Sequence, residues 1–144
     1  MTYGWAILVT IIFSVFLWQM GVFDFGSPTP GYRGFSQVKP LDWKASTTNN
    51  SLHMIITNEA GSSLLLPANG ISATVGTVNC GTAPLSTVDP FRPGQSLQVI
   101  VSCPGLSGSY EAGDYYRANV TITYQNPGSG IGHNSVGIIF GPAE

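Results

Sequence analysis

The chain has 144 residues, of which five are Lys or Arg and seven are Asp or Glu, so only 8% are charged. Soluble globular domains carry about 25% charged residues. The net charge of -2 excludes a polycationic nucleic-acid binder, which needs clustered Lys and Arg to neutralise phosphates. A content of 43% apolar residues excludes intrinsic disorder.

The first segment of the chain is apolar and uncharged as far as Asp24. Residues 4–23 read GWAILVTIIFSVFLWQMGVF, in which Gln19 is the strongly polar side chain. A helix of this length spans about 30 Å, the thickness of the hydrocarbon core of a bilayer. We therefore expect one long hydrophobic helix over residues 1–24, ended by Gly21 and the prolines that follow.

Three interpretations of this helix compete. A secretory signal peptide needs a basic start and a small-x-small cleavage site, and a membrane anchor usually has a basic cytoplasmic flank. No Lys or Arg precedes Arg33, which favours a third interpretation, a helix that leaves the bilayer and is buried again in a polymer. Thr10, Ser14 and Gly21 lie on one side of the helix. One interpretation is that these small residues allow close packing against other helices. The other is that the two hydroxyls bond to the backbone carbonyls four residues earlier in the same helix.

A family resemblance follows from these residues. Thr2 to Leu8, Thr-Tyr-Gly-Trp-Ala-Ile-Leu, and Gly21-Val22-Phe23 resemble the archaeal type IV pilin-like proteins of the archaellin superfamily, which have a class III signal peptide. The resemblance implies a precursor trimmed on the cytoplasmic side, helices packed in the core of an extracellular filament, and β domains outside. Family members have a Gln and a Glu just before this stretch; no Glu is found here, so that role is not transferred.

The rest of the chain is expected to form a linker and one domain. Residues 25–34 are rich in Gly and Pro, as in linkers. In residues 35–144, short runs of β-forming residues predict about seven strands and no further helix, which favours an immunoglobulin-like all-β sandwich. Together with the N-terminal helix, this domain puts the chain in the α+β class. The expected strands cover residues 35–38, 52–57, 62–66, 71–78, 96–103, 115–124 and 136–140.

Two strands and two turns have clear patterns. Residues 116–124 and 96–103 alternate between apolar and polar side chains, which predicts strands with one wet face. Residues 125–130, Gln-Asn-Pro-Gly-Ser-Gly, predict a hairpin loop between the last two strands. Before the strand at 96–103, Gly94 is expected to adopt a positive φ in a turn.

The residues that could support chemistry are few. Cys80 and Cys103 are predicted to form a disulfide, which we prefer to a metal site shared with His53 and His133, because no two of these four residues have the close spacing of zinc ligands. The remaining polar residues match no catalytic or phosphate-binding motif. We expect no enzymatic activity and no cofactor. Two sequons make Asn49 and Asn119 candidate glycosylation sites if the domain is exported.

The sequence therefore predicts a structural protein. We expect a pilin subunit of an extracellular helical filament, which consists of identical copies and serves adhesion or surface attachment. The subunit is expected to be inserted in the cell membrane before assembly, and the filament is expected to need no nucleic acid. The alternative is a monomeric, membrane-anchored binding module at the cell surface. The expected contacts in the polymer core are seven large side chains of the helix: Ile7, Leu8, Ile11, Ile12, Phe13, Phe16 and Leu17.

Overall fold

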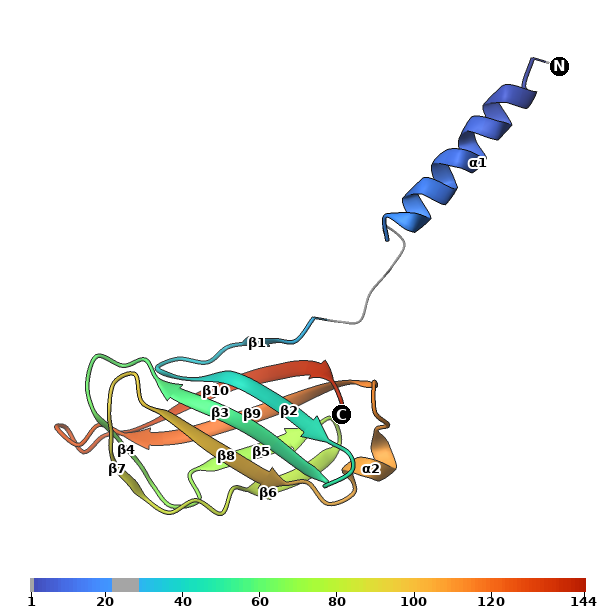
Figure 1. The fold of residues 1–144 in the computed structure, drawn as a ribbon. Helices are drawn as coiled ribbons and strands as arrows, with labels where there is room; N and C mark the ends of the chain where they lie inside the picture. Colours follow the sequence, from blue (N-terminus) through green and yellow to red (C-terminus); the bar gives the residue numbers. More distant parts are fainter. Residues whose placement is uncertain (1, 22–28) are drawn as a thin grey trace.

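The computed structural model describes residues 2–21 and 29–144, which form two helices and ten strands (Figure 1). Helix α1 (Gly4–Gln19) is followed by β1 (Gly31–Arg33) and by nine further strands, with the one-turn helix α2 (Leu106–Ser109) between β8 and β9. These nine strands are β2 (Val38–Ser46), β3 (Ser51–Asn58), β4 (Leu64–Leu66), β5 (Ile71–Val75), β6 (Val78–Thr82), β7 (Val88–Phe91), β8 (Ser96–Ser102), β9 (Tyr115–Gln125) and β10 (Gly132–Pro142).

The expectation of an α+β protein with one long hydrophobic helix over residues 1–24 is wrong. Helix α1 has 16 residues, and the described residues are otherwise mostly β strands. The helix ends at Gln19 because Gly21 takes a left-handed conformation, with φ at +70°, and its N–H bonds back to the carbonyl of Trp18. The apolar run is thus longer than the helix. Residues 22–24 of the expected helix lie outside the described residues.

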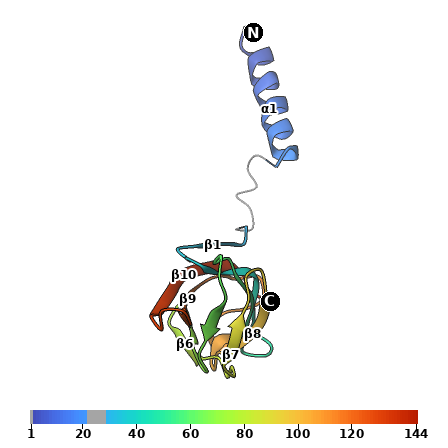
Figure 2. The same cartoon turned by 90° about the vertical axis from the view of Figure 1, so that its left-hand side faces the viewer.

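The strands form two sheets that face each other (Figure 2). The larger sheet has the order β1-β10-β9-β4-β7, with β5 also paired to β9 and β6 paired to β5; the smaller sheet has the order β2-β3-β8. Every pairing is antiparallel. Apolar side chains from the inner faces fill the space between the sheets, among them Leu52, Met54 and Val101 from one sheet and Val120, Ile122 and Ile139 from the other.

The alternating patterns read from the sequence are confirmed. In β9 the side chains from Tyr116 to Tyr124 are buried at every second position, and in β8 Val99 and Val101 are buried while Ile100 is exposed. The hairpin loop lies where it was predicted, between Gln125 of β9 and Gly132 of β10. Gly94 has a φ of +75° in the turn before β8. These patterns were visible because each strand has one buried and one exposed face.

Other elements differ from the expectation. Residues 31–33, assigned to the linker, form β1 and pair with residues 138–140 of β10. The single strand expected at 71–78 is the hairpin β5–β6, which turns at Gly76 with φ at +56°. The strand expected at 35–38 starts only at Val38 and continues to Ser46 as β2. Strand β7 and helix α2 were not expected.

The predicted disulfide between Cys80 and Cys103 is confirmed. Cys80 lies in β6 of the larger sheet, and Cys103 follows the last residue of β8 in the smaller sheet. Both cysteines are buried in the core, and Cys103 has no exposed surface. The bond therefore ties the two sheets to each other across the core.

A buried hydroxyl joins β10 to the segment that leads into β2. Ser135 is fully buried; its Oγ donates to the carbonyl of Val38 at 2.7 Å and accepts from the N–H of Ser36 at 2.9 Å. Ser135→Ala would leave both backbone groups without these partners. We expect the free energy of unfolding to fall by about 1–3 kcal/mol, measured by urea denaturation. Ser102→Ala, an exposed serine of β8, is the matched control and should change stability by less than about 0.5 kcal/mol.

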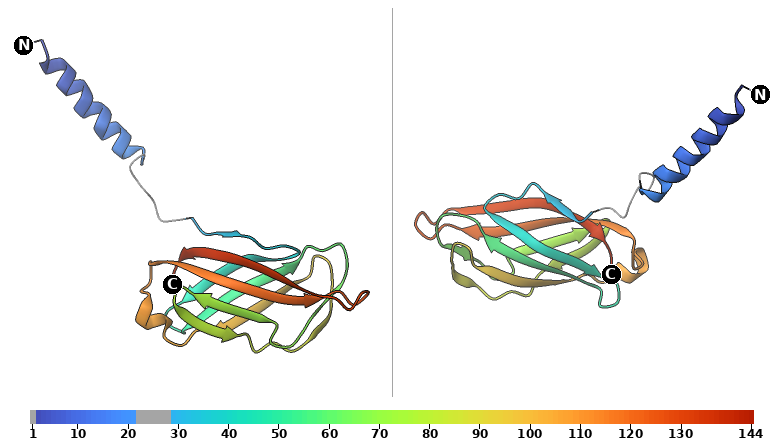
Figure 3. Two further views of the ribbon diagram at one scale, coloured as in Figure 1. Left: turned by 180° about the vertical axis from the view of Figure 1, so that it is seen from behind. Right: turned by 45° about the horizontal axis from the view of Figure 1, so that its top comes forward.

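The two ends of the sandwich are built differently. The C-terminal residues run beside α2 (Figure 3), where Ala143 exchanges backbone hydrogen bonds with the segment before β9 and Glu144 bonds with Ala45 and Thr47. Tyr116 is buried in the core near this end of the sandwich, which holds α2 and the C-terminal residues. Burial raises the pKa of the Tyr116 hydroxyl well above the ordinary value of 10.0. The long β9–β10 hairpin loop forms part of the opposite end.

Candidate functional site

The first candidate site is the surface of α1, which is apolar and uncovered. None of its residues is buried. Of the seven predicted contact residues, six are between 57% and 62% exposed, namely Ile7, Leu8, Ile11, Ile12, Phe13 and Phe16, while Leu17 is partly buried. Large apolar side chains in water favour burial against other apolar surface. The described part of the sandwich does not provide this burial.

The two hydroxyls of α1 are bonded within the helix. Thr10 Oγ1 donates to the carbonyl of Ala6 and Ser14 Oγ donates to the carbonyl of Thr10, both at 2.8 Å. These are the i−4 bonds that the sequence left open as one of two alternatives. Because the hydroxyl protons are used within the helix, α1 presents an almost entirely apolar surface to its surroundings.

The expectation that this segment spans a membrane is not supported. Over residues 2–21 and 29–144, no helix combines the length and the apolar character that crossing a bilayer requires. The expectation had equated the full apolar run of residues 4–23 with the helix, whereas the turn at Met20 and Gly21 shortens it.

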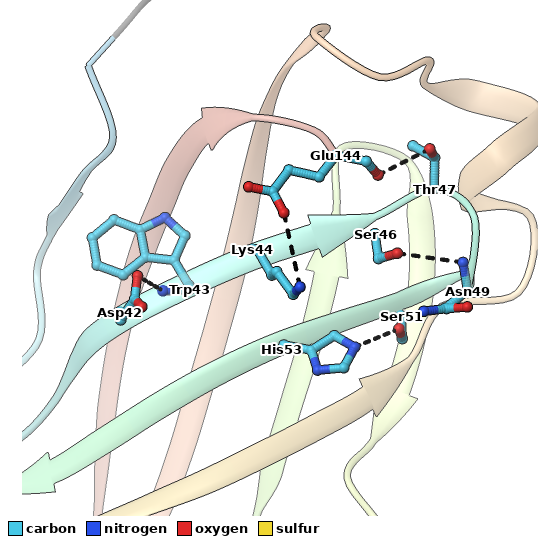
Figure 4. A network of polar contacts seen from close by, with 9 residues as sticks. All are labelled: Asp42, Trp43, Lys44, Ser46, Thr47, Asn49, Ser51, His53 and Glu144. Atoms are coloured by element: carbon cyan, nitrogen blue, oxygen red, sulfur yellow. Dashed lines mark hydrogen bonds and ion pairs between the residues drawn. The ribbon is translucent and has the colours of Figure 1, made fainter.

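The second candidate site is a hollow of about 200 Å³ on the outer face of the β2–β3–β8 sheet. Figure 4 shows five of the residues that line it, which come from β2, β3 and the C-terminal segment: Asp42, Trp43, Lys44, His53 and Glu144. The lining residues, which we call the polar hollow, are Asp42, Trp43, Lys44, His53, Met54, Ile55, Gln98 and Glu144. The strand register explains this grouping, since Lys44 is paired with His53 and Asp42 with Ile55.

The polar hollow is rich in hydrogen-bond acceptors. Lys44 Nζ lies 3.8 Å from Glu144 Oε2, while one oxygen of Asp42 accepts the backbone N–H of Trp43 at 2.9 Å. Gln98 adds an amide at the rim. Two carboxylates and an amide carbonyl suit a cationic hydrogen-bond donor, and a guanidinium group matches carboxylate geometry best.

Apart from His53, sequence reasoning did not single out the residues of the polar hollow. In β2 the alternation is interrupted at Leu41, where the register shifts between Pro40 and Asp42. This irregularity hides Asp42 and Lys44 from a period-of-two pattern. Glu144 reaches the hollow only because the C-terminal backbone bonds to Ala45 and Thr47, a contact between residues far apart in the chain.

The two histidines have different neighbours: His53 contacts a hydroxyl, and His133 stacks on an aromatic ring. His53 lies on the face opposite buried Met54, and its Nε2 is 2.9 Å from Ser51 Oγ. His133 lies in β10 and stacks on Tyr124, with ring centroids 5.6 Å apart. Within the ranges that the structure describes, no three His, Cys, Asp or Glu side chains gather as metal ligands would.

Both candidate glycosylation sites are exposed. Asn49 lies in the turn between β2 and β3, where its N–H is 3.4 Å from Ser46 Oγ. Asn119 lies in the middle of β9 on the outer face of the larger sheet, between Thr74 of β5 and Ile138 of β10. Either side chain is accessible, and modification at these positions remains a prediction.

No protein-family model matches the chain, and no curated protein matches it significantly.

Proposed function

We propose that the protein is the structural subunit of an extracellular helical filament that serves surface attachment. In this pilin-like arrangement, the α1 helices of many copies pack together as the filament core, and the disulfide-bonded sandwich of each copy lies outside. The role is association between identical copies, and it needs neither an active site nor a cofactor.

The observation that supports this proposal is the uncovered apolar surface of α1. Ten side chains of the helix are large, apolar and at least half exposed: Trp5, Ile7, Leu8, Val9, Ile11, Ile12, Phe13, Val15, Phe16 and Trp18. Full burial of one such side chain contributes about 1.5–3 kcal/mol. Even the remaining exposed part of ten side chains therefore gives a large driving force for association.

The distribution of these side chains favours a bundle of several helices. The apolar side chains occur at consecutive positions, so they surround the helix, and α1 carries no charged residue from Gly4 to Gln19. A helix that is apolar on all sides must be surrounded by apolar neighbours. A single groove or one partner helix would cover only part of this surface, whereas the core of a filament covers all of it.

A direct test is assembly of the full chain from detergent. We expect that removal of detergent from purified protein yields filaments of uniform width in negative-stain electron microscopy, and that sedimented material contains only this chain. Single copies that stay dispersed, or that bind to lipid vesicles without polymerising, would contradict the proposal. Vesicle binding would instead support the alternative, a membrane-anchored binding module.

A further inference from the structure

The two outer faces of the sandwich differ in charge. The part of the larger sheet formed by β1, β10, β9 and β5 carries Arg33 and Arg117, and none of these four strands contains Asp or Glu. The acidic residue of this sheet, Asp89, lies in β7, at the other edge beyond β4. We call the outer face of these four strands the basic face. It also exposes apolar side chains of β10, of which Val136 is 53% and Ile138 is 37% exposed.

Strand register places both arginines on this outer face. Arg117 lies between buried Tyr116 and buried Ala118 and is exposed. Arg33 pairs with exposed Ile138, whereas its neighbour Tyr32 pairs with buried Ile139. Arg33 belongs to β1 and Arg117 to β9, the two strands that flank β10, so the arginines lie on opposite sides of β10. They are offset by two residues along β10, because Arg33 pairs with Ile138 and Arg117 with Phe140.

The opposite outer face, formed by β2, β3 and β8, has an excess of carboxylates. It carries Lys39 and Lys44 together with Asp42, Glu59 and Glu144, a balance of two positive and three negative charges. We call it the acidic face. Glu59 is paired with Lys39 at 2.6 Å, a hydrogen bond that raises the pKa of Lys39 above its ordinary value.

The unpaired charges on the two faces have opposite signs. The ion pairs among residues 2–21 and 29–144 are Lys39–Glu59 and Lys44–Glu144. Neither arginine of the basic face takes part in one, and neither does Asp42 in the polar hollow. Because the two faces lie on opposite sides of one sandwich (Figure 2), these groups cannot meet within one copy, but they can meet between two copies.

We propose that the basic face of one sandwich docks on the acidic face of a second copy, with an arginine entering the polar hollow. This proposal rests on the proposed function, which supplies many copies side by side. Asp42, Glu144 and the Gln98 carbonyl offer acceptors for a guanidinium group, and in this arrangement Val136 and Ile138 would meet the exposed Ile100 and Leu41 of the other face. Asn119 pairs with Ile138 on the basic face, so the contact excludes a glycan at this position.

Such a contact has a definite symmetry. It joins two different surfaces, so each docked pair keeps one free basic face and one free acidic face, and the contact repeats without closing. It would therefore connect sandwiches in the outer layer in a head-to-tail row. A two-fold contact, basic face against basic face, would bring arginines together, which like-charge repulsion disfavours.

The test reverses each face separately in the full chain. The basic-face variant is Arg33→Glu with Arg117→Glu, and the acidic-face variant is Asp42→Lys with Glu144→Lys. Each variant has two faces of the same sign, so we expect the critical concentration for assembly to rise at least about tenfold. A 1:1 mixture restores opposite signs at every contact, and we expect it to assemble near the wild-type critical concentration, with the two variants alternating.

Matched charge reversals away from both faces serve as controls. Arg92→Glu, in the turn after β7, and Glu111→Lys, after α2, change exposed side chains and should leave the critical concentration within about twofold. Circular dichroism and thermal unfolding test whether each variant is folded. If the basic-face variant is unfolded, Arg33→Gln with Arg117→Gln replaces it; if the acidic-face variant is unfolded, Asp42→Asn with Glu144→Gln replaces it.

The outcomes separate this contact from the filament itself. Wild-type filaments together with unchanged critical concentrations for both reversed variants would overturn the face-to-face contact and leave the filament proposal intact. Failure of the mixture to recover would overturn it as well. Absence of wild-type filaments would contradict the proposed function.

Discussion

The substitution Ile11→Lys is expected to abolish filament assembly while the sandwich stays folded. Ile11 lies in the middle of α1 and is 59% exposed, so a lysine there is solvated in the single copy. In a packed helical core the ammonium would be buried without a partner, at a cost of several kcal/mol per subunit. Sedimentation and electron microscopy, at concentrations at which the wild-type chain assembles, measure the effect.

A charge at the end of the same helix is the matched control. Gln19 is the last residue of α1 and is already polar. Gln19→Lys adds a positive charge at the C-terminus of the helix, where the helix dipole favours it. We expect this variant to assemble within a few-fold of the wild-type critical concentration. Filaments of Ile11→Lys at the wild-type critical concentration would contradict packing of α1 in the core.

Removal of the Cys80–Cys103 disulfide is expected to give the largest loss of stability in the sandwich. The bond closes a loop with a sequence separation of 23 residues, and restriction of the unfolded chain by such a loop contributes about 3 kcal/mol. For a domain of this size, Cys80→Ala with Cys103→Ala should lower Tm by about 10 °C. Thermal unfolding followed by circular dichroism measures the shift.

A reductant separates the loss of the covalent bond from the loss of the sulfur atoms in the core. Both cysteines are buried, so unfolding is measured after equilibration with dithiothreitol in denaturant. The reductant should destabilise the wild-type chain by a similar amount and leave the double alanine variant unchanged. Equal stability of oxidised and reduced wild-type protein would contradict a stabilising role for the bond.

The sequence was a good guide where one local pattern determines the structure. Strand β9 was found because every second side chain from Tyr116 to Tyr124 enters the core. The disulfide was found because the two cysteines form an even pair and lack the close spacing of zinc ligands. Six of the seven predicted contact residues of α1 are exposed in the single chain, while the contacts themselves remain a prediction.

Where long-range contacts determine the structure, the sequence was a poor guide. Residues 31–33 resemble a linker, and only pairing with β10 makes them a strand. The length of α1 was overestimated because the whole apolar run to residue 23 was counted as helix, whereas the helix already ends at Gln19, before the left-handed Gly21. The polar hollow depends on an irregularity at Leu41 and on Glu144 returning to Lys44, and neither can be read from periodicity.

Strand β1 also has a mechanical consequence. It is the first element of the sandwich after α1 along the chain, and it is held by only three residue pairs with β10. Tension that enters from the helix side therefore loads these pairs first and the Ser135 hydrogen bonds next, before it reaches the eleven pairs between β9 and β10. The disulfide lies outside this path, so we expect β1 to yield under load before the covalently tied core changes shape.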